Sequence, residues 1–168
     1  ILTGPRPGGT TTLAPALSND TLTGTETLTA MQRRIAPTAT TAGVNGDFFN
    51  HLAVDLDGRK PGAITEEVAV EQTEAILHGH PAVFDALARF AAGATRSVTF
   101  TMGNHDPGLL FAGVREVVAR RIGGRHRFVL DAYDFDGVHV EHGMQREPMN
   151  AFNPSRYFAE EDGRVCIN

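Results

Sequence analysis

Two helical runs lie in the middle of the chain, and the first begins after Thr65. Thr65 is a suitable N-cap, and the two glutamates that follow it place negative charge where a helix N-terminus favours it. This pattern predicts a helix over residues 65–77. A second amphipathic pattern, with Pro81 in its first turn, predicts another helix over residues 81–92.

Strand-like patterns follow these two helices. A buried strand is predicted over residues 97–102, and it leads directly into the polar run Gly103-Asn104-His105-Asp106. A third helix is expected over residues 107–121 and a further strand over 127–130, while Asp136-Gly137 indicates a two-residue hairpin turn. The alternation of strands and helices predicts an α/β fold, a layered mixed β-sheet with flanking helices.

The N-terminal part of the chain has a different amino-acid composition. Residues 1–42 hold twelve threonines and four prolines, and short runs such as 21–23 and 26–29 alternate weakly like exposed strands. We therefore divide the chain into a Thr-rich extended segment, residues 1–43, and an α/β domain, residues 44–168. The first residue is Ile1 and no signal-peptide pattern follows it, so we expect the chain to be a fragment whose natural N-terminus lies upstream.

Composition narrows the functional classes. A chain of 168 residues with 41% apolar content suits one soluble globular domain, and the net charge of -5 without a Lys/Arg run gives no signal for nucleic-acid binding. No apolar stretch is long enough to span a membrane. Cys166 is the only cysteine, so an intrachain disulfide and a thiolate metal centre are excluded. Oligomeric state and compartment stay unknown, with the cytoplasm slightly favoured.

Three ligand-type side chains lie beside glycines in the α/β part of the sequence. Asp47, Asn104 and His142 offer carboxylate, amide and imidazole donors of the kind that hard or borderline divalent cations prefer. A metal at such a site would activate water and neutralise phosphate charge. His105 follows a proposed ligand, so we expect it to donate a proton to a leaving oxygen, with Asp106 orienting its imidazole.

Several of these residues could instead have a purely structural role. Gly103-Asn104-His105-Asp106 could be an ordinary turn in which Asp106 caps the next helix, and His142 could be a histidine at a strand end with no ligand. His139 alternates with two valines and is expected at the surface. Arg146 and Arg156 could contact a phosphate, or they could be placed there by chance.

Three strings in this order resemble the second, third and fourth motifs of calcineurin-like metallophosphoesterases: Gly46-Asp47-Phe48-Phe49-Asn50, Gly103-Asn104-His105-Asp106 and Glu141-His142-Gly143. The resemblance covers about residues 44–158. It implies a hydrolase of phosphate mono- or diesters with two divalent metal ions, Mn, Fe or Zn. Asp47 would bridge the metals, Asn104 and His142 would bind the second one, and His105 would contact the phosphate ester or its leaving group, with Asp106 as its partner.

The departures from that family concern the first metal. The opening Asp-x-His motif has no counterpart before Asp47, and the closing Gly-His-x-His motif is missing, because Gly79-His80-Pro81 reads as a turn between two helices. Asn50 stands where members commonly carry aspartate. The chain thus supplies three ligands to one metal site, and we expect an incomplete metallophosphoesterase-like domain that holds only one metal. A non-catalytic remnant is the alternative.

A second resemblance concerns the N-terminal part. The run from Ala42 to Asn50, preceded by the Thr-rich stretch, is similar to a phosphodiester glycosidase domain, a class that cleaves a sugar from a phosphodiester. Both families share the string Asn-Gly-Asp-Phe-Phe. The chain could therefore be a junction of two unrelated pieces at that string.

Overall fold

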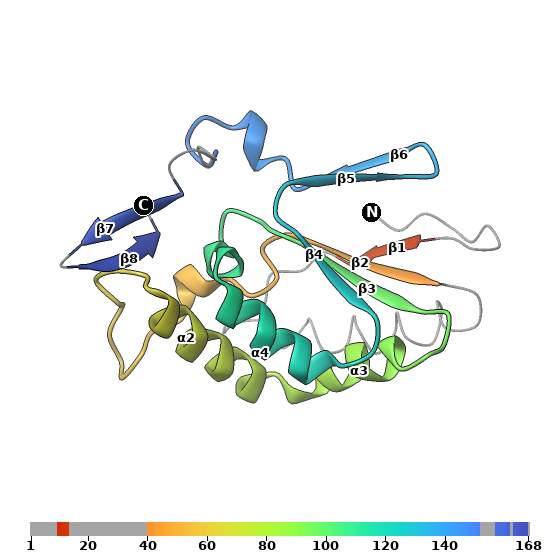
Figure 1. Ribbon diagram of the computed structural model, residues 1–168, viewed down its shortest axis with the longest axis horizontal. Coiled ribbons are helices and arrows are strands. Elements are labelled where there is room, and N and C mark those ends of the chain that lie inside the picture. Colours follow the sequence, from red (N-terminus) through yellow and green to blue (C-terminus); the bar gives the residue numbers. More distant parts are fainter. Residues whose placement is uncertain (1–9, 14–39, 152–156, 162, 168) are drawn as a thin grey trace.

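The computed structural model describes residues 10–13, 40–151, 157–161 and 163–167 (Figure 1). Its elements, with η for 3-10 helices, are in chain order β1 (Thr10–Leu13), β2 (Thr41–Asn45), η1 (His51–Ala53), α2 (Glu66–Gly79), α3 (Pro81–Ala91), β3 (Ser97–Thr101), η2 (Pro107–Leu110), α4 (Ala112–Ile122), β4 (His126–Val129), β5 (Ala132–Phe135), β6 (Val138–Glu141), η3 (Met144–Arg146), β7 (Phe158–Glu161) and β8 (Arg164–Ile167).

Among the described residues, β1, β2, β3 and β4 form a sheet in that order, and all three pairings are parallel. Antiparallel pairing occurs in two separate hairpins, β5–β6 and β7–β8. The α/β class is thus confirmed at the level of helices combined with parallel and antiparallel strands. The hairpin turn predicted at Asp136-Gly137 is also present, with φ values of 47° and 79° that suit a two-residue turn.

The helices α2, α3 and α4 lie together on one side of the sheet (Figure 1). A cluster of buried aromatic rings fills the space beneath them, with Phe48 packed edge-on against Phe49 at 5.2 Å and against Phe84 at 5.9 Å. Phe100 of β3 lies 6.0 Å from Phe48. Phe48 and Phe49 belong to the motif from Gly46 to Asn50, so their packing in the core fixes the start of the loop that carries the candidate site.

The first two predicted helices are confirmed as α2 and α3. Thr65 caps α2 as expected, because its hydroxyl oxygen accepts the backbone N–H of Val68 at 3.4 Å. The turn predicted at Gly79-His80-Pro81 joins the two helices. The strand predicted at 97–102 corresponds to β3, which ends one residue earlier, and the strand predicted at 127–130 corresponds to β4, which begins and ends one residue earlier.

The third helix was expected to begin at Pro107, and this is wrong. Residues 107–110 form a 3-10 turn, Phe111 is extended, and α4 begins only at Ala112. The cause is tertiary, since the carboxylate of Glu66 on α2 accepts the backbone N–H of Gly113 at 2.5 Å and so stabilises the N-terminus at that point. Gly123, with φ 59°, follows the last residue of the helix as its C-cap.

The N-terminal predictions are only partly within the described residues. The weakly alternating runs at 21–23 and 26–29 lie outside them. The boundary placed after residue 43 falls inside β2, and β1 pairs with β2 from Thr10↔Thr41 to Leu13↔Val44. The origin of the first 43 residues in a different domain stays a prediction.

A buried histidine lies between the motif loop and α2. His51 has no exposed surface, and its Nε2 is 3.0 Å from the hydroxyl of Thr73. The side-chain amide of Gln72 donates to the carbonyl oxygens of His51 and Val54, at 3.0 and 2.8 Å. Burial lowers the pKa of His51 to about 4, because the charged imidazolium is poorly solvated there.

We expect His51 to make the fold sensitive to acid. In the unfolded chain this histidine takes up a proton near its ordinary pKa of 6.5, whereas the folded chain takes it up only near about 4. Stability is therefore fully present above pH 6.5 and is lost as the pH falls towards 4, by about 3 kcal/mol in total. Urea unfolding of the wild type and of His51→Gln at pH 7 and pH 4 checks this. Between these pH values the free energy of unfolding of the variant should fall by about 3 kcal/mol less than that of the wild type. His78→Gln, an exposed position, should behave as the wild type; equal pH dependence in both variants would contradict the assignment.

Candidate functional site

The two motif loops leave neighbouring parallel strands at the same edge of the sheet. Asn45, the last residue of β2, is paired with Thr101, the last residue of β3. The backbone N–H of Gly46 donates to the carbonyl of Thr101 at 2.9 Å. Carboxyl ends of parallel strands are where open α/β sheets place their sites, and here they bring the loops after residues 45 and 101 side by side.

The loops need glycine at positions 46 and 103, because the backbone there lies very close to residues of the other motif strings. A Cβ atom on Gly103 would lie 2.2 Å from Oδ1 and 2.3 Å from the backbone nitrogen of Asp47. A Cβ atom on Gly46 would lie 2.2 Å from Cδ2 of His142 and 3.0 Å from the Cα of Gly103. The three motif strings are therefore in direct contact, although they are far apart in sequence.

Asp47 is held between the other two strings. Its backbone is left-handed, with φ 50°, and its Oδ1 accepts the backbone N–H of His105 at 2.9 Å. Its Oδ2 lies 3.4 Å from Nε2 of His142. The Asp47 side chain is 28% exposed and that of His142 is 19% exposed, so the pair is reachable from solvent but largely shielded.

The Asp47–His142 pair has a spacing that fits a shared metal ion. Two ligands that each lie about 2.1 Å from a tetrahedral metal are about 3.4 Å apart. The observed separation of Oδ2 and Nε2 is 3.4 Å. Among the described residues, no group of three or more His, Cys, Asp or Glu side chains could hold a metal. Asn104, the third predicted ligand, is half-buried in the loop after β3.

Asp106 is fully buried, and its carboxylate binds backbone amides. One oxygen accepts at 2.8 and 2.9 Å and the other at 3.0 and 3.3 Å, from the N–H groups of Phe49, Asn50, Phe48 and Gly103 respectively. Burial raises the pKa of Asp106 to about 6, against the opposing effect of these donors. The carboxylate thereby ties the loop after β2 to the loop after β3.

This arrangement corrects the expected partnership of Asp106 with His105. The partner of the His105 ring is Asn50, whose Oδ1 lies 2.8 Å from Nδ1. Asp106 cannot serve as that partner because its oxygens face the amides of the two loops. Asn50 was noted in the sequence only as a departure from aspartate. No sequence pattern signalled this contact; in the structure Asn50 has a left-handed backbone, φ 51°, which asparagine tolerates better than most residues.

The β5–β6 hairpin carries a surface cluster of charged groups. His139 is exposed, as predicted, and its Nδ1 lies 2.8 Å from a carboxylate oxygen of Asp134. Hydrogen bonds to Asp134 and Glu141 raise the pKa of His139. Arg146 joins this cluster by donating from Nε to Glu141 at 2.5 Å. Arg156, the other arginine considered as a phosphate contact, lies outside the described residues.

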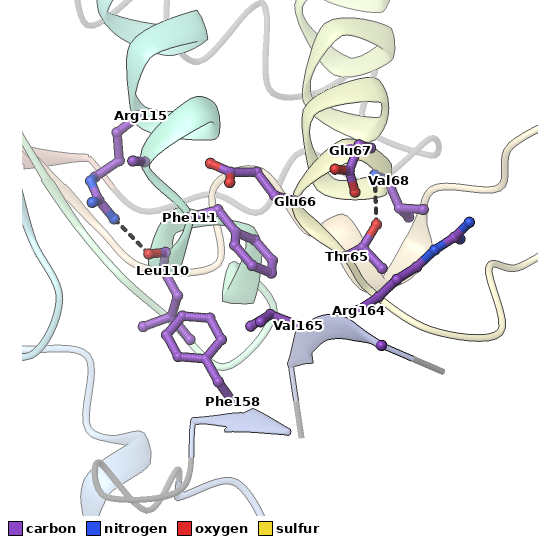
Figure 2. A pocket seen from close by; sticks show the side chains of 12 residues that line it. Thr65, Glu66, Glu67, Val68, Leu110, Phe111, Arg115, Phe158, Arg164 and Val165 are labelled. Atoms are coloured by element: carbon purple, nitrogen blue, oxygen red, sulfur yellow. Dashed lines mark hydrogen bonds between the residues drawn. The ribbon is translucent and has the colours of Figure 1, made fainter. Parts of the chain in front are cut away.

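A separate cavity of about 920 Å³ opens between the N-terminal ends of α2 and α4 and the β7–β8 hairpin (Figure 2). Phe111 and Phe158 both line it, and their rings are in contact at a tilt, with centres 5.4 Å apart. Its lining residues are Thr65, Glu66, Glu67, Val68, Leu110, Phe111, Ala112, Arg115, Phe158, Gly163, Arg164 and Val165. None of the predicted site residues is among them, so the cavity and the motif loops are distinct features.

No protein-family model matches this chain, and no curated protein or solved structure matches it. Within the described residues, no helix is long and apolar enough to cross a membrane. Functional interpretation therefore depends on the chemistry of the motif loops. Their reactive groups are the Asp47–His142 pair and the His105 ring held by Asn50.

Proposed function

We propose that this chain carries the site of a metal-dependent hydrolase that acts on phosphate monoesters or diesters. The observation that supports it most strongly is the 3.4 Å separation of Asp47 Oδ2 and His142 Nε2, which suits two ligands of one divalent cation. The order of the three motif strings, similar to that of calcineurin-like metallophosphoesterases over about residues 44–158, supports the same class.

Asp47, Asn104 and His142 would hold the metal, for which Mn, Fe and Zn are the candidates. When bound, the metal supplies Lewis acidity and an activated water. A second metal, expected for the family, would need ligands equivalent to the missing motifs, so this chain is assigned one metal site.

His105 is assigned the proton transfer. Its backbone N–H is fixed by Asp47 Oδ1 at 2.9 Å, which couples the position of the acid to that of the metal ligand. With the proton on Nδ1 donated to the side-chain Oδ1 of Asn50, Nε2 is left to face the substrate. A protonated ring would donate from Nε2 to the leaving oxygen.

A non-catalytic remnant is the second candidate, and the surroundings of Asp106 favour it. The four amide hydrogen bonds give this part of the motif a structural role that needs no chemistry. In that case the loops would stay together without turnover.

Turnover of an aryl phosphate and of a bis-aryl phosphodiester, with Mn²⁺, Zn²⁺ and Fe²⁺ in turn, separates the two candidates. We expect metal-dependent hydrolysis that His105→Ala lowers about 100-fold in kcat, the contribution typical of a positioned general acid. His78→Ala, at an exposed helix position, is the matched control and should keep full activity. Absence of turnover with all three metals would reject the hydrolase for this chain, and full activity of His105→Ala would reject His105 as the acid.

A further inference from the structure

A side-chain hydrogen bond joins the parallel sheet to the backbone immediately before His142. The Nδ2 of Asn45, at the end of β2, donates to the carbonyl oxygen of Glu141, at the end of β6, over a distance of 3.0 Å. The two residues are 96 positions apart in the sequence. Glu141 is followed by His142, so this bond lies one peptide away from the candidate metal ligand.

The strand pairing by itself does not place His142 over the sheet. β5 and β6 pair with each other, in a sheet separate from the one that contains β2 and β3. Because a peptide unit is planar, fixing the carbonyl oxygen of Glu141 also fixes the Cα of His142. The imidazole then packs on Gly46, where a Cβ would come within 2.2 Å of the ring.

Unused hydrogen-bonding capacity remains at this junction. Oδ1 of Asn45 and Nδ1 of His142 are both buried, and neither has a hydrogen-bond partner among the described residues. A histidine that binds a metal through Nε2 carries a proton on Nδ1, and that proton is normally accepted by a neighbouring oxygen. Asn45 thus combines a donor for the backbone with an acceptor of the type that a metal-bound His142 would need.

We propose that Asn45 is a positioning residue, which sets the His142 ring so that Nε2 faces Oδ2 of Asp47 across a divalent cation. A carboxamide suits this place because it donates to a carbonyl without carrying charge. The inference rests on the proposed function, since it presupposes a metal at the Asp47–His142 pair. It adds a contact outside the ligand set that governs how tightly the metal is held.

The test is Zn²⁺ binding by titration calorimetry, together with the ¹⁵N resonances of the histidine rings. In the wild type, Zn²⁺ should shift the Nε2 resonance of His142. Asn45→Ala should weaken Zn²⁺ binding about tenfold or more, as is typical when the support of a ligand is removed. Asn45→Leu, which keeps a larger side chain and suits a strand, should show the same loss if the alanine variant folds poorly. Asn150→Ala, at an exposed position, should bind as the wild type does.

The possible failures are distinguishable. If wild-type Zn²⁺ binding shifts His142 and both Asn45 variants bind equally well, the positioning role is overturned while the metal site stands. If Zn²⁺ leaves the His142 resonance of the wild type unchanged, the metal site itself is rejected, and with it both the proposed function and this inference. Thermal unfolding of each variant shows that the comparison is made between folded proteins.

Discussion

Asp106→Asn is expected to lower the free energy of unfolding by about 4 kcal/mol, although it replaces one atom by another of similar size. Each carboxylate oxygen of Asp106 accepts two backbone N–H groups, and the side chain is fully buried. Asparagine keeps one of these oxygens. Its NH₂ group would face two amide donors that have no other acceptor in the loops, and each such buried donor costs about 1–3 kcal/mol.

The measurement for Asp106→Asn is urea unfolding at pH 7, where the carboxylate is ionised because its pKa is about 6. Asp57→Asn is the matched control, since Asp57 is exposed and has a left-handed backbone, φ 52°, that asparagine adopts readily. The control should change stability by less than about 0.5 kcal/mol. A similarly small effect at Asp106 would show that the amides do not depend on its charge.

Elements defined by local patterns could be predicted from the sequence. The N-cap of Thr65, the proline that begins α3 and the turn at Asp136-Gly137 act within a few residues, so their signals are contained in short windows. The meeting of Asp47 with Gly103 could also be anticipated, because both follow strands that end at the same edge.

Features set by contacts between distant residues could not be predicted. Asp106 and His105 are adjacent in the sequence, which suggested a pair, but the carboxylate binds amides 56 to 58 positions away. The start of α4 depends on Glu66, which lies 47 positions from Gly113. The spacing of apolar residues along the chain carries no information about such contacts. The short polar side chains involved can also form hydrogen bonds with several alternative partners equally well.

Gly103→Ala is expected to have an effect of similar size to that of Asp106→Asn, for a steric reason. The new methyl group would lie 2.3 Å from the backbone nitrogen of Asp47 and 2.2 Å from its Oδ1. A side chain could turn away, but the backbone of Asp47 is fixed by the sheet and by the amides bound to Asp106, so the two loops must separate. We expect a loss of about 4 kcal/mol in the free energy of unfolding, which places the change among severe substitutions.

The separation should also remove Zn²⁺ binding, because Asp47 Oδ2 would leave its position opposite His142. Urea unfolding and Zn²⁺ titration of Gly103→Ala measure the two consequences together. Gly62→Ala is the matched control, since a Cβ there meets nothing within 4 Å; it should keep wild-type stability and binding. Wild-type stability in Gly103→Ala would mean that the loops are further apart than described. Lost stability with intact Zn²⁺ affinity in the folded fraction would instead show that the metal is bound without Asp47, and the ligand set would have to be reassigned.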